Sequence, residues 1–228
     1  MENTYSPITP KKSAVLVDLS FFIKAYQKSQ GKFSPEDFAK RLKDYLFKTL
    51  AIYGDTIHRF YIYDCEPIPE GRTMKPISKE QIIFKDTPIY QFRKKLLEEL
   101  KRQPFFAIRL GKLSGKAEWK LKQNIQKELL NKKKTLEELT DEDFVLDIRQ
   151  KGVDMKIGLD IASLSIKKQV EKIILITGDS DFVPAIKMAR REGIIVQLDP
   201  MRHKTLSPDL LEHVDLLYSI LPKPDWNL

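Results

Sequence analysis

Short apolar runs alternate along this chain with longer stretches whose apolar residues recur at helical spacing, and this alternation constrains the fold most. The runs "SAVLVDL", "IHRFYIYD", "FFAIRLGKL", "KIILITG" and "IIVQLDP" have the length and the β-branched and aromatic content of strands. Strands that alternate with helices form a mostly parallel sheet covered by helices on both faces. The sequence therefore predicts an α/β fold with three layers, α/β/α, around a mostly parallel central sheet.

The predicted helices have recognisable starts and stops. Ser34 is a suitable N-cap and Pro35 a suitable first residue for a helix that Gly54 ends. The proline-rich stretch 65–86 is expected to be irregular. Further helices are expected over 88–103, 116–134, 151–169, 181–193 and 207–221.

The chain of 228 residues shows no internal repeat and no long linker. We expect a loose arm over 1–12, a single domain over 13–221 and a tail over 222–228. A lysine-rich, helical segment is expected near 112–134. No 18-residue apolar run or secretory signal pattern is visible, and Cys65 is the one cysteine, so a cytoplasmic protein outside the membrane is expected.

The positive charge is unevenly distributed. The net charge is +8, and the stretch from Gly111 to Lys134 holds eight lysines and two glutamates. Such a surplus attracts polyanions, above all nucleic acid, although a solvated lysine-rich helix without a partner has the same composition. If the partner is RNA, the lysines expected to hold its phosphates are Lys112, Lys116, Lys120, Lys122 and Lys151.

Aspartates follow the predicted strands repeatedly. Asp18, Asp64 and the pair Asp179 and Asp181 each come directly after an apolar run, and Asp154 stands at the start of a predicted helix. Because ligands bind beyond the carboxyl ends of parallel strands, these side chains are expected at one edge of the sheet. Each aspartate alone is explained equally well as a helix cap.

Taken together, the aspartates indicate a site for a hard divalent cation. Mg²⁺ prefers carboxylate and water oxygens in octahedral geometry, and it lowers the pKa of bound water without a histidine base. The histidines at 58, 203 and 213 lie outside these motifs. The glycine-rich patterns that hold phosphates and the G-x-S-x-G pattern of serine hydrolases are absent from the sequence.

Three segments resemble the NYN branch of the PIN-like metal-dependent ribonucleases: "VLVDLSFF", "KGVDMKIGLDI" and "LITGDSDFVPAIKMARREGIIVQL". The resemblance implies a PIN-like, Rossmann-like fold, Mg²⁺ or Mn²⁺ in an acidic pocket, and cleavage of RNA. The catalytic and metal-binding residues that it implies are Asp18, Asp154, Asp179 and Asp181. Asp160 matches a further family aspartate, but it lies about 120° from Asp154 around a helix. Supporting roles fall to Thr177, Ser180 and Ser20.

Phe21 departs from the family pattern, which usually has an asparagine three residues after the first aspartate. Either the site tolerates the change and the chain is an endoribonuclease acting on single-stranded RNA, or it is an RNA-binding module with weak or no catalysis. A haloacid-dehalogenase-type phosphatase is disfavoured, because Ser20 occupies the place of that family's second aspartate. A homo-oligomer or a partner protein is left open by the sequence.

Overall fold

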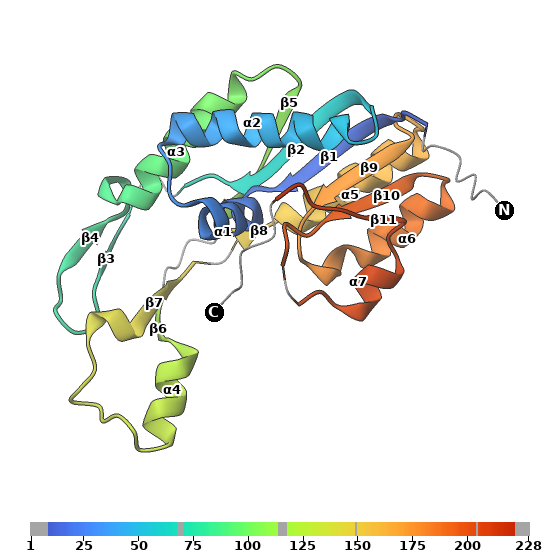
Figure 1. The fold of residues 1–228 in the computed structure, drawn as a ribbon. Coiled ribbons are helices and arrows are strands. Elements are labelled where there is room, and N and C mark those ends of the chain that lie inside the picture. Colours follow the sequence, from blue (N-terminus) through green and yellow to red (C-terminus); the bar gives the residue numbers. More distant parts are fainter. Residues whose placement is uncertain (1–8, 68–70, 114–117, 149, 204, 222–228) are drawn as a thin grey trace. The chain divides into compact units, whose positions relative to one another are not determined.

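A central sheet organises the larger part of the chain in the computed structural model, which describes residues 9–67, 71–113, 118–148, 150–203 and 205–221. The chain divides into two compact units, and the first combines residues 1–64, 95–111 and 152–228. Six parallel strands form its sheet (Figure 1). In order across the sheet they are β11 (Leu216–Leu217), β10 (Ile195–Asp199), β9 (Lys172–Ile176), β1 (Lys12–Asp18), β2 (Thr56–Cys65) and β5 (Phe106–Leu113).

The two strands at the centre of this sheet are buried along their length. Residues 13–17 of β1 and all of β9 are buried, and Val15 lies opposite Ile174 in their parallel pairing. A strand that is covered on both faces needs a continuous apolar run rather than an alternating one, which is what these two segments have. Both strands end at the same edge, so the loops that follow them, beginning at Asp18 and Thr177, lie side by side.

Helices cover both faces of the sheet, which confirms the three-layer α/β/α prediction (Figure 1). Right-handed crossovers place helices on opposite faces when the chain moves across a sheet in opposite directions. From β1 to β2 the chain passes through α1 (Leu19–Gln30) and α2 (Pro35–Ala51), which pack through rings such as Phe22 and Phe38, with centroids 6.0 Å apart. When the chain moves across the sheet in the opposite direction, it passes through α5 (Val153–Ile166), η3 (Ser180–Phe182) and α6 (Val183–Arg191).

The second unit, residues 65–94 and 112–151, is built from short antiparallel pairs. Trp119 joins two of these pairs, because its indole Nε1–H donates to Thr73 Oγ1 at 3.0 Å. β8 pairs with the last residues of β5, so that Lys112 lies opposite Lys151. The elements are β3 (Arg72–Met74), β4 (Gln81–Ile83), η1 (Phe84–Asp86), β6 (Glu118–Leu121), α4 (Gln123–Leu130), η2 (Asp141–Asp143), β7 (Phe144–Asp147) and β8 (Gln150–Lys151), and α3 (Pro88–Lys101) crosses into the first unit.

Three predicted elements differ from the observed ones. Within the described part of the lysine-rich stretch, residues 118–134, the α-helix is limited to α4, because Glu118–Leu121 pairs antiparallel with β7 and its Lys120 forms an ion pair with Asp147. The expected closing helix 207–221 stops at Glu212, and β11 follows, because Leu216 and Leu217 extend the sheet beside β10. The irregular stretch 65–86 contains the β3–β4 hairpin.

The remaining predictions concern the domain, the N-terminal arm and the C-terminal tail. The single domain over 13–221 stays a prediction, and the tail 222–228 and most of the arm lie outside the described residues. Lys12 of that arm opens β1. Among the described residues, no helix has the length and apolar character required to cross a membrane.

Candidate metal centre

Asp18 ends β1 and begins α1, which fixes the direction of its carboxylate. The carboxylate Oδ1 accepts a hydrogen bond from the Phe21 N–H at 3.0 Å, as the N-cap of α1. Burial raises the pKa of Asp18, the Phe21 hydrogen bond opposes that rise, and the charges of Asp154 and Asp64 add to it. The raised pKa means that the ionised form of Asp18 is disfavoured, first because burial removes it from water and then because its neighbours are also acidic.

Asp64 joins Asp18 from the next strand. β1 and β2 pair in parallel, with Asp18 opposite Tyr63, so Asp64 stands at the same edge. The side chain of Asp64 is buried, with 2% of the residue exposed, and Ser20 Oγ donates to its Oδ1 at 3.3 Å. The family motif does not single out this aspartate, but its place at a strand end does. Ser20, expected to support the site, holds Asp64.

Asp154 comes to the same edge from α5. Gly152 precedes the helix with φ 80°, a left-handed conformation that glycine adopts without steric cost. Asp154 lies in the first turn, where a partial loss of hydration first, and then the charges of Asp179 and Asp181, raise its pKa. Asp154 therefore couples to Asp18 as well as to the two aspartates after β9.

The turn after β9 holds Asp179 and Asp181. Thr177 is fully buried, and its Oγ1 accepts from the Asp179 N–H at 3.2 Å. Asp179 in turn caps η3, because its Oδ1 accepts from the Asp181 N–H at 2.9 Å. The predicted support by Thr177 is thus a hydrogen bond to the backbone. Ser180 is an exposed residue of η3, which Asp179 caps.

The four predicted aspartates share one electrostatic neighbourhood. Asp18 feels the charge of Asp154, and Asp154 feels the charges of Asp179 and Asp181. Each influence that shifts the pKa of Asp154 raises it. Carboxylates in this state fit a hard divalent cation, because the cation would supply the missing positive charge and prefers oxygen ligands. Among the described residues, however, the ligand atoms that gather within 4.8 Å of one another are those of Asp209, Glu212 and His213, so the binding of Mg²⁺ or Mn²⁺ by Asp18, Asp154, Asp179 and Asp181 stays a prediction.

Asp160 has a different environment. Its Oδ2 accepts from the Tyr63 hydroxyl at 2.8 Å and from Arg109 Nε at 3.1 Å. Burial and then the charge of Asp160 raise the pKa of Tyr63. The Arg109 guanidinium already compensates the carboxylate, which suits a residue that fixes α5 against β2 and β5. A direct metal contact by Asp160 stays a prediction.

The lysines predicted to hold RNA belong to the second unit. Lys112, Lys120, Lys122 and Lys151 are exposed, and Lys116 lies outside the described residues. Lys120 forms an ion pair with Asp147. Lys112 and Lys151 lie directly opposite each other in the β5–β8 pair, where like charges destabilise the pairing.

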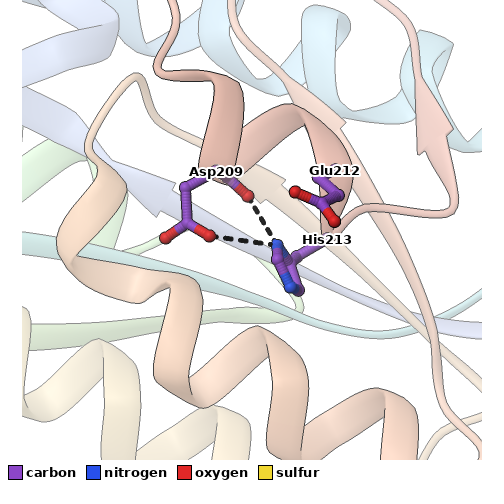
Figure 2. Close-up of side chains that lie close together, drawn as sticks. All are labelled: Asp209, Glu212 and His213. Atoms are coloured by element: carbon purple, nitrogen blue, oxygen red, sulfur yellow. Dashed lines mark hydrogen bonds and ion pairs between the residues drawn. The ribbon is translucent and has the colours of Figure 1, made fainter.

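A second group of metal-type ligands lies on α7 (Pro208–Glu212) and just after it. Ligand atoms of Asp209, Glu212 and His213 lie within 4.8 Å of one another (Figure 2). His213 Nδ1 lies 2.7 Å from the Asp209 carbonyl oxygen and 3.3 Å from its Oδ1, and Lys187 Nζ lies 3.7 Å from the same carboxylate. Asp209 thus already has Lys187 as a cationic partner. This group was not predicted from the sequence, although the spacing of Asp209 and His213 suits one helix face.

The central parallel sheet with helices on both faces forms a three-layer α/β/α fold, and the family match indicates that this fold is PIN-like and of the nuclease type. The sequence profile described as the NYN domain matches residues 12–219, and the chain belongs to the NYN domain family. This confirms the resemblance seen in the sequence. No curated protein matches the chain. Among solved structures, a protein of unknown function from Vibrio parahaemolyticus is similar over 93% of this chain and 94% of that chain, with 14% identity and a TM-score of 0.49.

Proposed function

We propose that this protein is a metal-dependent endoribonuclease that cleaves phosphodiester bonds of single-stranded RNA. The observation that carries the proposal is the parallel pairing of β1 and β9, which brings Asp18 and the turn with Asp179 and Asp181 to one edge of the sheet, where the charge of Asp154 also acts on Asp18. Membership of the NYN domain family supports the same class of chemistry. The cytoplasmic location expected from the sequence belongs to the same proposal.

The four aspartates would hold Mg²⁺ or Mn²⁺, and each must be ionised to do so. A bound divalent cation supplies two things: a nucleophilic water with a lowered pKa, and stabilisation of the charge that develops on the leaving oxygen. The raised pKa of Asp18 and Asp154 fits this role, since their ionised state is costly until a cation is present. The chemistry then requires no histidine base.

The surroundings of the aspartates hold them in place before substrate binds. The Phe21 N–H fixes Asp18, the Asp181 N–H fixes Asp179, and buried Thr177 fixes the backbone between β9 and η3. Carboxylates held by backbone groups on rigid strands keep their geometry, so little reorganisation is needed when charge develops. Asp64, fixed by Ser20, adds to the negative potential that would retain the cation.

We assign the backbone of the RNA to exposed lysines of the second unit. The directly opposed Lys112 and Lys151 repel each other, and a phosphate beside them would remove that cost. Lys122 extends the positive charge, whereas Lys120, which forms an ion pair with Asp147, and Lys116 stay predicted contacts. Such contacts supply salt-dependent affinity rather than sequence choice.

The second candidate is an RNA-binding module on the same fold that turns over slowly or not at all. Phe21 favours it, because its apolar ring stands where the family usually has a hydrogen-bonding asparagine. Both candidates predict salt-sensitive RNA binding. Cleavage that depends on a divalent metal separates them.

The deciding experiment incubates a fluorescent single-stranded RNA with the protein in Mn²⁺, in Mg²⁺ or in EDTA. We expect cleavage with either metal, none in EDTA, and a loss of at least about 100-fold in Asp179→Asn, as for removal of one charge-stabilising group. Asp209→Asn is the matched control, because it neutralises an exposed carboxylate of the other cluster and should cleave normally. Cleavage in EDTA, or equal activity of Asp179→Asn, contradicts the proposal. Binding without turnover in any metal establishes the second candidate.

A further inference from the structure

The side chain of Phe21 lies outside the apolar core, beside the acidic edge. α1 buries Leu19, Phe22, Ile23 and Tyr26, whereas Phe21 is only half-buried. Its backbone N–H holds the Asp18 carboxylate at 3.0 Å. The ring therefore belongs to the surface around the candidate metal ligands.

Gly178 brings the ring of Phe21 against the turn that carries Asp179. A Cβ placed on Gly178 would lie 2.9 Å from Cε2 of Phe21, closer than real Cβ contacts allow. A side chain at position 178 would therefore force the Phe21 ring to shift, and the backbone at Gly178 is not left-handed. The aromatic ring lies between the backbone after β1 and the backbone after β9, next to the residues proposed to hold the metal.

His203 completes an aromatic pair with Phe21. The ring centroids lie 6.1 Å apart with an interplanar angle of 50°, and His203 is exposed. The turn before it holds Met201 and Arg202 at φ 47° and φ 60°, a region that non-glycine residues seldom occupy.

Several hydrogen bonds hold this strained turn in place. The Met201 N–H donates to Asp199 Oδ1 at 2.8 Å, and Arg202 donates to the carbonyl oxygens of Ser219 and Leu221. Backbone strain that is held this firmly is typical of functional sites. The imidazole is therefore positioned beside Phe21 by the structure around it.

We propose that Phe21 and His203 form a stacking site for one nucleobase of the RNA, at the nucleotide next to the scissile phosphate. Unstacked bases bind to aromatic faces, and this contact is tolerant of sequence because every base has a π-face. Where an asparagine would offer hydrogen bonds, this chain offers an apolar ring at the same edge. The location beside the scissile phosphate rests on the proposed ribonuclease function, whereas base binding by the two rings does not.

The test compares adenosine 5′-monophosphate with ribose 5-phosphate, which lacks the base, by NMR with Mg²⁺ present. We expect the nucleotide to shift the Phe21 ring signals and the His203 Cε1–H signal, and ribose 5-phosphate to leave them in place. Phe21→Leu keeps an apolar side chain without a π-face, and it should weaken binding of the nucleotide about tenfold. Phe21→Tyr should bind the nucleotide normally. His203→Ala should weaken nucleotide binding, and because His203 is exposed, this change should leave the fold intact.

Equal shifts with both ligands, or unchanged nucleotide binding in Phe21→Leu and His203→Ala, overturn the inference. Its failure is distinct from failure of the ribonuclease proposal. RNA cleavage without base-dependent shifts refutes the stacking site alone. Base-dependent shifts in a protein that cleaves no RNA support the stacking site and refute the ribonuclease proposal.

Discussion

Replacing Asp18 with asparagine should stabilise the protein without metal and destabilise it relative to wild type with metal. Asparagine is as good an N-cap as aspartate, so the hydrogen bond from the Phe21 N–H survives the change. The charge does not survive, and the raised pKa of Asp18 shows that this charge is costly in the folded state. Removing it at pH 7 in EDTA should add about 0.5–2 kcal/mol to the free energy of unfolding, the range that a single stabilising substitution commonly gives.

The same change removes a metal ligand. A cation at 100 times its dissociation constant stabilises the wild-type protein by about 2.7 kcal/mol, and the variant should gain much less. At about 2–4 °C per kcal/mol for a chain of this size, the variant should melt about 1–8 °C higher in EDTA. In Mn²⁺, the melting temperature of wild type should rise by about 5–11 °C, so that wild type then melts at a higher temperature than the variant.

The assay is thermal unfolding followed by circular dichroism, in EDTA and in Mn²⁺, with Asp209→Asn as the control. The pH dependence has a definite sign. Because the folded-state pKa of Asp18 is raised, the wild-type protein loses stability as the pH rises from the ordinary carboxyl pKa of 3.8 through the folded value. The advantage of Asp18→Asn in EDTA should therefore disappear as the pH falls toward 3.8. A variant that is no more stable than wild type in EDTA, or that gains as much from Mn²⁺, refutes the reasoning.

Two further predictions concern the scaffold. In Asp55→Asn the fully buried Lys172 loses its carboxylate at 2.9 Å, which should cost about 3–5 kcal/mol in chemical denaturation. Burial lowers the pKa of Lys172, and Asp55 opposes that fall. The stability difference between Asp55→Asn and wild type should therefore shrink as the pH approaches 10.5, where Lys172 loses its charge in both states. A stability difference that does not change with pH would contradict this account. Gly178→Ala should displace the Phe21 ring, change the NMR signals of that ring and weaken nucleotide binding. Gly158→Ala is the control, because a Cβ there meets nothing within 4 Å, and it should have none of these effects. Equal effects of the two changes would contradict the assigned contact.

The sequence predicts the centre of this protein well, because local and global signals agree there. β1 and β9 have continuous apolar runs, each is followed by an aspartate-bearing turn, and parallel pairing alone brings those turns to one edge. The helix over 19–30 was not predicted, although Phe22 and Tyr26 of α1 pack in the core beside α2. Leu19, Phe22, Ile23 and Tyr26 recur at helical spacing, so the sequence carried a signal for this helix that the prediction missed.

The remaining differences arise from tertiary pairing. Leu216 and Leu217 become a strand because the edge of β10 is there to receive them, and Glu118–Leu121 becomes a strand because β7 lies opposite. The meeting of Phe21 with His203 depends on a strained turn after β10 that no local pattern specifies. Asp160 shows the reverse case, since its family position suggested a ligand and its observed partners are Tyr63 and Arg109.

Anomalous diffraction from a crystal soaked in Mn²⁺ tests the central claim most directly. A peak among the carboxylates of Asp18, Asp154 and Asp179 is the predicted result, with Asp181 near it. The same crystal offers the cation a second choice, the group of Asp209, Glu212 and His213 (Figure 2). A peak at that second group alone, or no peak at either place, would contradict the assignment of the acidic edge as the metal centre.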